Sequence, residues 1–599
     1  RPFGDGDCVS CDDKHSNFGT FNTFNIYIIL KGLPIYCDLK LSDCPRSSTM
    51  NTMQVLLVVA CCLHIAQGDE HTELKYLERE FHAWRKFERG IGDFRQDDRL
   101  EQFGLELIDD RTSYAQYFLD RLLNISKVNL SEKDQMDYTI MQDMLQAYIK
   151  GKDWSRWSYL TPMSWLEGLQ RNPHHFVDSL SFLSIGDFEN YISKLYDVPR
   201  LFKEYKISFD EAIRLGRTSN IRSIDRIPDQ IDEILNVSVT ESIYYTPFIK
   251  YLNETYLTLP DKEAVIESVM KRGLAAVEGV MQAFRELKDY LENVYMKNTR
   301  PSAGVGALEG GADFYQACLN WYLSLNMTPQ DIHDLGVAEV ARVQAKMHAI
   351  MHKQGHHNMT IREYFQELKK RDDMFFDTED DIIAEYENII HQRIEPHLSR
   401  LFKDQPGLPL EMGHYESELF RAARLVVDSG LHYYNWTRDQ AVDYFILHTA
   451  ESEEGIKVEV DRYITWPGQA TTYKVGELRI KKLRERAEKE LGDLFDVQEF
   501  HMAVLENGAL PLTVLEERVN KWIMEYRKQR MEEEKNGDDC ECVMMPRAKP
   551  KVRCKRYSPL MNEKNGAERV VQAHLGLVFV GWLSITGMVT LGSMVSWAS

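Results

Sequence analysis

Polar side chains that could bind a substrate gather around a Pro-Gly turn at residues 458–476, VEVDRYITWPGQATTYKVG. Guanidinium, phenol and amide groups that lie among aromatic residues need hydrogen-bond partners, and a concave site is one place where they stay available to a ligand. A buried structural network is the alternative. The candidate substrate-binding residues of this turn are Arg462, Tyr463, Gln469 and Tyr473.

A second stretch, residues 415–441, combines charged and apolar residues in a helical pattern. In YESELFRAARLVVDSGLHYYNWTRDQA, Arg421 and Arg424 are one helical turn apart and stand beside an apolar run. We expect this helix to end at Gly430, with His432 directly beyond its end. Packing alone explains this stretch poorly, so it is a second candidate for a binding site.

Other reactive patterns are weak or absent in the sequence. The glycine-rich segment 303–311 lacks the G-x-G-x-x-G spacing, and neither a G-x-S-x-G elbow nor a phosphate-binding P-loop occurs. Among four neighbouring histidines, Ala349 stands where a zinc protease would carry its glutamate base, and Gly355 ends the helix. We interpret these histidines as solvated residues of a surface helix end: His348, His352, His356 and His357.

The elements that must position these residues are mostly helices, from about residue 70 to 527. Apolar residues recur at spacings of three and four in LKYLEREFHAWRKF, residues 74–87, and similar stripes occur at 264–295 and 512–535. Strand patterns are limited to short pieces near KVEV, residues 457–460, and ITW, residues 464–466. The expected fold class is therefore mainly α, with few short strands.

Two helix starts can be read directly from local residues. Thr328 is a predicted N-cap before Pro329, with Asp331 in the first turn, where the helix dipole favours a negative charge. Thr437 and Gln440 have the spacing of a capping box.

Both ends of the chain carry signals of the secretory pathway. Residues 1–49, before the first Met at Met50, are interpreted as a translated leader and left out of the fold. Residues 50–68 contain a short apolar run that ends in Ala-Gln-Gly, which predicts a cleaved signal peptide. Sequons suit a secreted glycoprotein, although the one at Asn326 is weakened by a following Pro. The other sequons are at Asn124, Asn129, Asn236, Asn253, Asn358 and Asn435.

The C-terminal residues predict attachment to a membrane. Residues 528–567 are charged and contain Pro, as in a stalk, and residues 568–599 lead into an uncharged apolar tail. Three small residues that begin at Asn565, a polar spacer and this tail match the order of a GPI-attachment signal. A retained transmembrane helix and a buried core helix are the alternatives. We expect a cell-surface location.

Charge and cysteine content narrow the possible classes of protein. The net charge of −21 argues against nucleic acid as a partner, because phosphate binding depends on clustered Lys and Arg. Only Cys318 lies in the main body, so the apolar core, not disulfides, must hold it together. Cys540, Cys542 and Cys554 could pair with one another or with Cys318.

Four segments of the chain resemble the domain-of-unknown-function 885 family. The most specific are RYITWPGQATTYKVG and RAARLVVDSGLH, and weaker similarity extends over most of the body, here taken as 69–527. The resemblance implies a helical, gluzincin-like zinc metallopeptidase fold. The similar segments are residues 308–343, 418–441, 459–476 and 500–523.

Intact members of this family carry an HE-x-x-PGHH motif and a later Glu-Gly-Trp segment. In such a site two imidazoles and a carboxylate hold zinc, the motif Glu acts as the base, and Arg or Tyr donors stabilise the oxyanion. By resemblance, Gln469 could brace the turn. The family implies a pocket role for Arg462, Tyr463, Tyr473, His432 and His501.

This sequence departs from the family at the zinc motif. It contains no HE-x-x-PGHH, HE-x-x-H or Glu-Gly-Trp, and the two helices that flank the metal segment in intact members are joined here through MGHY, residues 412–415. The loss of a whole segment between recognisable flanks suggests exon skipping or a gap in the gene model. We expect no cofactor in this chain, although zinc is expected in intact members.

The sequence thus predicts a secreted or cell-surface glycoprotein that resembles a zinc metallopeptidase but is inactive. One alternative is a surface protein that binds peptides or adheres through the remaining cleft. A second is a fragment of an active zinc peptidase from which an exon was skipped. A third is a chain that does not fold stably because a core segment was removed. The expected partners are a peptide or small molecule and the membrane.

Overall fold

The computed structural model describes residues 23–30, 33–40, 70–88, 99–100, 102–171, 173–178, 180–252, 262–371, 378–388 and 408–535. The predicted signal peptide, the apolar tail, Asn253 and Asn565 lie outside these residues, as do the three late cysteines. Within the predicted leader, strands β1 (Thr23–Leu30) and β2 (Leu33–Lys40) form an antiparallel hairpin in which Thr23 faces Lys40. The main body is helical, in agreement with the predicted class.

The first helices of the body form a small group with its own apolar core. The predicted stripe on α2 is confirmed, since Leu74, Leu77 and Phe81 are buried against Phe118 of α3. Two stacked ring pairs, Trp154 with Trp321 and Trp157 with Phe314, join α5 to a later helix. This group comprises α2 (Glu70–Glu88), α3 (Leu107–Leu123), α4 (Glu132–Lys150) and α5 (Lys152–Ser158).

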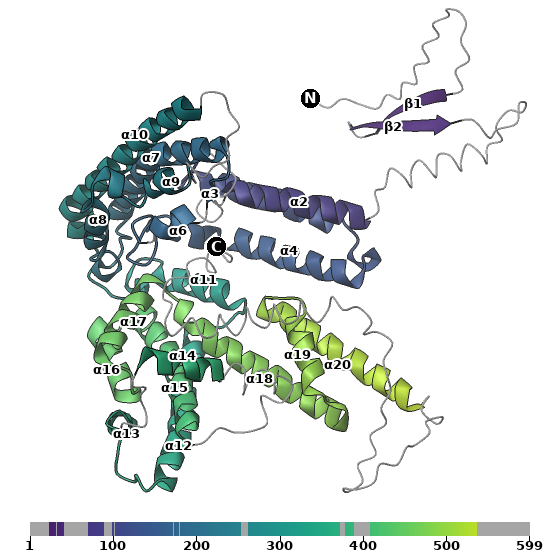
Figure 1. Cartoon of the computed structure of the whole chain (residues 1–599). Helices are drawn as coiled ribbons and strands as arrows, with labels where there is room; N and C mark the ends of the chain where they lie inside the picture. Colours follow the sequence, from purple (N-terminus) through teal and green to yellow (C-terminus); the bar gives the residue numbers. More distant parts are fainter. Residues whose placement is uncertain are drawn as a thin grey trace, which may run out of the picture.

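A second group contains the largest apolar cluster. Its long helices α7 and α10 lie side by side (Figure 1), with Phe202 of α7 packed edge-on against Phe284 of α10. The predicted stripe at 264–295 corresponds to α10 and the π-helical turn that follows it. The group comprises α6 (Pro173–Asp178), α7 (Ile185–Leu215), α8 (Ile227–Leu235), α9 (Thr246–Lys250) and α10 (Lys262–Tyr290).

The C-terminal half is organised around one central helix, α15, which contacts α12, α16, α17 and α18. The middle and C-terminal part of α15 is almost entirely buried, from Ala422 to His432. The helices of this half are α11 (Gly311–Leu323), α12 (Pro329–Lys353), α13 (Ile361–Leu368), α14 (Glu379–Asn388), α15 (Leu408–His432), α16 (Arg438–His448), α17 (Glu453–Thr465), α18 (Thr472–Leu491), α19 (Val497–Leu505) and α20 (Leu512–Lys535).

Short helical turns connect these helices. α20 continues to Lys535, into the segment assigned to the stalk. No helix in the described ranges is both long and apolar enough to cross a membrane. The short turns are η1 (Lys127–Asn129), η2 (Ile221–Ser223), η3 (Val239–Glu241), η4 (Leu291–Tyr295), η5 (Met296–Asn298), η6 (Val305–Ala307), η10 (Gln469–Thr471) and η11 (Gly492–Leu494).

The locally predicted helix ends are confirmed. Thr328 caps α12 in a capping box with Asp331, and Thr437 caps α16 in a capping box with Gln440. Gly355, at φ +88°, follows the end of α12, where a left-handed residue is needed. Each signal depends on residues within one turn of the helix end.

Two expectations about secondary structure are wrong. KVEV and ITW form no strands, because both lie on α17 or at its end, where Ser452 caps the helix and Ile456, Val460 and Tyr463 bury one face. The helix of the second stretch does not end at Gly430 but continues to His432. Gly430 serves packing instead, since a Cβ there would lie 2.5 Å from the ring of Trp436.

Helices α12 and α15 pack closely along their length (Figure 1). Gly336 permits this approach, because a Cβ at that position would meet Leu425 and Val426 of α15 at less than 3.0 Å. The close pairing holds α15 in place, and α15 carries Arg421, Arg424 and His432.

Candidate functional site

The Pro-Gly turn connects α17 to α18 and is built from the residues that the sequence singled out. α17 ends at Thr465, Gly468 has φ +85°, and η10 leads directly into α18. A Cβ at Gly468 would lie 3.3 Å from the Cβ of Cys318, which is buried and unpaired. The backbone N–H of Gly468 donates to the carboxylate of Asp428 on α15, so the turn is fixed to the central helix.

Three of the predicted site residues belong to one hydrogen-bond network that also includes Glu459. Arg462 donates from Nη1 to Oε1 of Gln469 at 2.6 Å and from Nη2 to Oε2 of Glu459 at 2.7 Å. The hydroxyl of Tyr463 donates to the same carboxylate at 2.8 Å. Burial acts to raise the pKa of Glu459, but the adjacent Arg462 holds it below its usual value. This geometry favours a structural network for Arg462, Tyr463 and Gln469.

Arg424 of α15 extends the same network. Its Nε donates to the backbone carbonyl of Ala470 at 3.0 Å, and its Nη2 lies 3.5 Å from Oε1 of Gln469. Burial lowers the pKa of this guanidinium. Its central carbon also lies 5.5 Å from the ring centre of Tyr463 and 5.3 Å from that of Tyr473. Arg424 thus joins the buried network to the more exposed Tyr473.

Tyr473 and Arg421 form the accessible edge of this cluster. Tyr473 is 38% exposed, and the guanidinium carbon of Arg421 lies 5.3 Å from its ring centre. Within the described part of the chain, neither the Tyr473 hydroxyl nor the Arg421 guanidinium has a hydrogen-bond or ion-pair partner. Both groups therefore keep donors available to a ligand.

His432 is held inside the fold by both of its ring nitrogens. Nδ1 accepts from the N–H of Val305 at 3.2 Å, and Nε2 donates to the carbonyl of Tyr463 at 2.9 Å. Burial lowers the pKa of His432 to about 3, so the imidazole is neutral at physiological pH. With both nitrogens engaged, the imidazole connects η6, α15 and α17 and has no nitrogen left for a metal or substrate.

His501 lies on α19, away from the other predicted residues. α19 packs through Phe500 and Ala503 against α20 and the C-terminal half of α18, which includes Leu483 and Ala487. Ten or more residues of α18 separate this contact from Tyr473, a distance of roughly 15 Å at 1.5 Å per residue. The structure does not bring His501 into the Arg–Tyr cluster.

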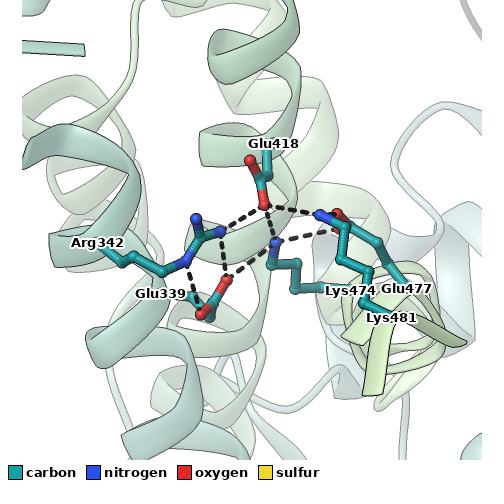
Figure 2. A network of polar contacts seen from close by, with 6 residues as sticks. All are labelled: Glu339, Arg342, Glu418, Lys474, Glu477 and Lys481. Atoms are coloured by element: carbon teal, nitrogen blue, oxygen red, sulfur yellow. Dashed lines mark hydrogen bonds and ion pairs between the residues drawn. The ribbon is translucent and has the colours of Figure 1, made fainter. Parts of the chain in front are cut away.

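A network of six charged residues fixes α18 to α12 and α15 (Figure 2). Fully buried Lys474 contacts three carboxylates, Glu418 at 2.8 Å, Glu477 at 3.0 Å and Glu339 at 3.1 Å. Arg342 also pairs with Glu339 and Glu418, and Lys481 pairs with Glu418 and Glu477. Burial acts to raise the pKa of Glu418, but Lys474 and the other cations lower it to about 2.

This charged network positions the candidate site. Lys474 directly follows Tyr473, and Glu418 lies one turn before Arg421, so the ion pairs hold the two sides of the Arg–Tyr edge at a constant distance. The three cations match the three carboxylates, which satisfies each buried charge. This network was not predicted from the sequence. The only local signal was a set of charged residues at otherwise apolar helix positions.

Asp428 is a second buried acid that was not predicted from the sequence. Tyr315 donates to its carboxylate at 2.6 Å, and Gly468 donates to it through the backbone. Burial nevertheless raises the pKa of Asp428 to about 7. Its signal was again local, a lone acid inside the apolar run of α15.

Because of Asp428, the free energy of unfolding is expected to fall as the pH rises. Because its pKa is higher in the folded state, the folded chain binds more protons than the unfolded chain between pH 4 and pH 7. Compared with Asp428→Asn, the wild type should lose up to about 1.4 kcal/mol of unfolding free energy per pH unit over this range. Urea unfolding of both proteins at several pH values measures this, and a constant difference between them would contradict the assignment.

The described residues do not supply a zinc site. Across the described ranges, no group of three His, Cys, Asp or Glu side chains is placed to hold a metal ion. Of the four neighbouring histidines, His352 in the last turn of α12 and His357 beyond it have tilted rings whose centres are 5.0 Å apart. The described residues therefore offer no ligand set for the zinc that the family resemblance implies.

Comparisons with known proteins place the chain in a family. A family model described as a bacterial protein of unknown function, DUF885, matches residues 86–414 and 408–519. The crystal structure of a candidate lipoprotein from Colwellia psychrerythraea is similar, with a TM-score of 0.63 and 19% identity over 77% of this chain and 99% of that chain.

A candidate lipoprotein of unknown function from Shewanella oneidensis also has a similar fold. Its TM-score is 0.50 at 13% identity, and the match covers 75% of this chain and 99% of that chain. No protein with curated annotation matches. Because the family model covers well over half of the sequence, the chain belongs to the DUF885 family.

Proposed function

We propose that this chain is a cell-surface protein that binds peptides along the accessible edge of α15 and α18 and does not hydrolyse them. The observation that carries the proposal is the pair formed by Arg421 and Tyr473. Their donors have no partner in the described part of the chain, and they lie beside the retained Pro-Gly turn. Charged and phenolic donors next to an exposed ring are suited to a peptide backbone or carboxylate.

We infer the absence of hydrolysis from the absence of the zinc-binding segment that intact family members carry. The sequence contains no HE-x-x-PGHH motif, and the two family matches meet and overlap at residues 408–414. α15 runs through this junction without a break, from Leu408 to His432. This continuity supports the view that a metal-binding segment has been lost between its two flanks. Without those ligands, water would have no zinc ion to lower its pKa.

A location at the cell surface is supported by three observations. Two proteins with a similar fold are described as candidate lipoproteins. Residues 50–68 and 568–599 carry the predicted signal peptide and membrane-attachment tail, with Asn565 as the proposed GPI site. The predicted acceptors within the described ranges all have exposed side chains: Asn124, Asn129, Asn236, Asn358 and Asn435.

The proposal is tested with the full chain produced in a secreting animal cell line. A mixture of short peptides is incubated with the purified protein, and binding and cleavage are followed by mass spectrometry, with zinc and with chelator. We expect bound, intact peptides under both conditions. Tyr473→Ala should abolish binding, and Tyr196→Ala, which removes a more exposed ring from α7, should not. One tightly bound zinc per chain and cleavage that stops with chelator would refute the proposal.

A second candidate function is favoured by the overlap of the two family matches at residues 408–414. The chain would then be one product of a gene that also encodes an active zinc peptidase. The genomic sequence between the codons for Pro409 and Tyr415 tests this directly. An intron there with an open exon that encodes HE-x-x-PGHH would support it, and uninterrupted coding sequence would exclude it.

A further inference from the structure

We propose that Arg421 and Tyr473 bind the carboxylate group of a peptide ligand, an inference that rests on the proposed function and names the chemical group recognised. The two residues come from helices joined by the charged network of Figure 2, so their separation is set by the fold.

The geometry places two guanidinium groups beside one aromatic ring. The central carbons of Arg421 and Arg424 both lie 5.3 Å from the ring centre of Tyr473. A guanidinium held near a ring face loses little rotational freedom when it binds, and the N–H groups on its edge still point away from the ring. Because Tyr473 is 38% exposed, a ligand can reach this edge from solvent.

The charge near this edge is positive, although the whole chain carries −21. Arg421, Arg424 and Arg462 face one fully engaged carboxylate, that of Glu459, which pairs with Arg462 and accepts from Tyr463. Asp428 is only about half ionised near neutral pH, because burial raises its pKa to about 7, so it offsets less than one of these three cations. The cluster therefore has unbalanced cations.

Two other groups of acids lie near Arg421 and do not fully balance its charge. Glu418 and Glu477 are neutralised by the cations of the charged network. Glu416 lies five residues before Arg421 on the same helix and is only partly ionised near neutral pH, because burial and the nearby Glu451 raise its pKa to about 7 although Arg421 acts to lower it. Glu416 forms no ion pair with Arg421 among the described contacts. An anion from outside the protein would therefore complete the charge balance.

The unused donors match a carboxylate. The edge of the Arg421 guanidinium can donate two parallel N–H bonds to the two oxygens of a carboxylate, and the Tyr473 hydroxyl supplies one more donor. A peptide carries this group at its C terminus and on Asp and Glu side chains. Inorganic phosphate is the competing anion, and the experiment includes it as a separate arm.

The test measures the binding of three fluorescent peptides to the full glycosylated chain. The first has neutral side chains and a free C terminus, the second is its amidated twin, and the third is amidated but contains one Glu. We expect amidation to weaken binding roughly 10- to 100-fold, as for the loss of a charged hydrogen bond. Recovery of affinity with the Glu peptide would extend the site to acidic side chains and support the carboxylate assignment.

Matched variants connect the effect to the two residues. Arg421→Gln should lower the affinity for the free-acid peptide to that for its amidated twin. The affinity for the twin should not change. Arg421→Lys should give an intermediate loss, because it keeps the charge without the two-pronged edge. Tyr473→Phe should lower the affinity for the free-acid peptide less than Arg421→Gln does. Arg484→Gln removes an exposed guanidinium that pairs with Glu488 on α18, the helix of Tyr473. This variant should bind the peptides like the wild type.

The outcomes separate the inference from the proposed function. Equal affinities of the wild type and Arg421→Gln for the free-acid and amidated peptides would contradict the carboxylate site. Peptide binding itself would still stand. Inorganic phosphate that displaces the peptide at lower concentrations than acetate would also overturn it. If no peptide binds the wild-type chain, the proposed function itself fails. Unchanged thermal unfolding of Arg421→Gln confirms that the variant is folded.

Discussion

Lys474→Met is expected to lower the free energy of unfolding by about 3–5 kcal/mol, because it leaves buried carboxylates without their central cation. Lys474 is fully buried and contacts Glu339, Glu418 and Glu477 within 3.1 Å. Met has a similar volume, so the loss of charge pairing, not a cavity, causes the effect. Urea unfolding of the full chain at neutral pH measures it.

The charged network contains its own control. Lys481→Met removes a cation from the same network, but this side chain is half exposed, so we expect a loss of at most about 1 kcal/mol. Adding Glu418→Gln to Lys474→Met should recover part of the stability, because it removes one of the uncompensated charges. Equal effects of the two lysine substitutions would show that Lys474 is not the centre of the network.

His432→Ala is expected to cost about 3–5 kcal/mol, through a cavity and two unpaired backbone groups. The variant leaves the N–H of Val305 and the carbonyl of Tyr463 without the imidazole that now connects them. Thermal unfolding measures the loss. His352→Ala, which truncates an exposed ring at the end of α12, should change stability by less than about 0.5 kcal/mol.

The His432 variant also distinguishes a structural role from a role in binding. At a temperature where His432→Ala remains folded, its affinity for the free-acid peptide should be that of the wild type. A His432→Ala variant that keeps its stability but loses peptide binding would show that His432 takes part in binding. The same result would contradict the hydrogen bonds that now account for both ring nitrogens.

Local features were predictable wherever neighbouring residues decide the structure. The caps at Thr328 and Thr437, the helix end before Gly355 and the Pro-Gly turn all depend on backbone groups within a few residues. The mainly α class follows from the periodicity of apolar residues in the same way. Membership of the family likewise followed from short specific segments, and the family match confirms it.

Predictions failed where the packing of side chains, and not the local residue types, decides the structure. KVEV has the residue types of a strand, but as a helix it packs Val460 into the cluster around α15 and Val458 against the cluster of α7 and α10. Gly430 resembled a helix end, yet it lies inside α15 because the ring of Trp436 occupies the space of a side chain. Sequence spacing contains no information about either neighbour.

The sequence by itself determined the helical body, its caps, the turn between α17 and α18 and the types of residue gathered there. Only the tertiary structure decided which of these side chains face inward. It joins Arg462, Tyr463 and Gln469 in one network through Glu459, encloses His432, and leaves Arg421 and Tyr473 at an accessible edge. The physical reason is that burial and pairing depend on partners far away in the chain, as Lys474 of α18 depends on Glu339 of α12.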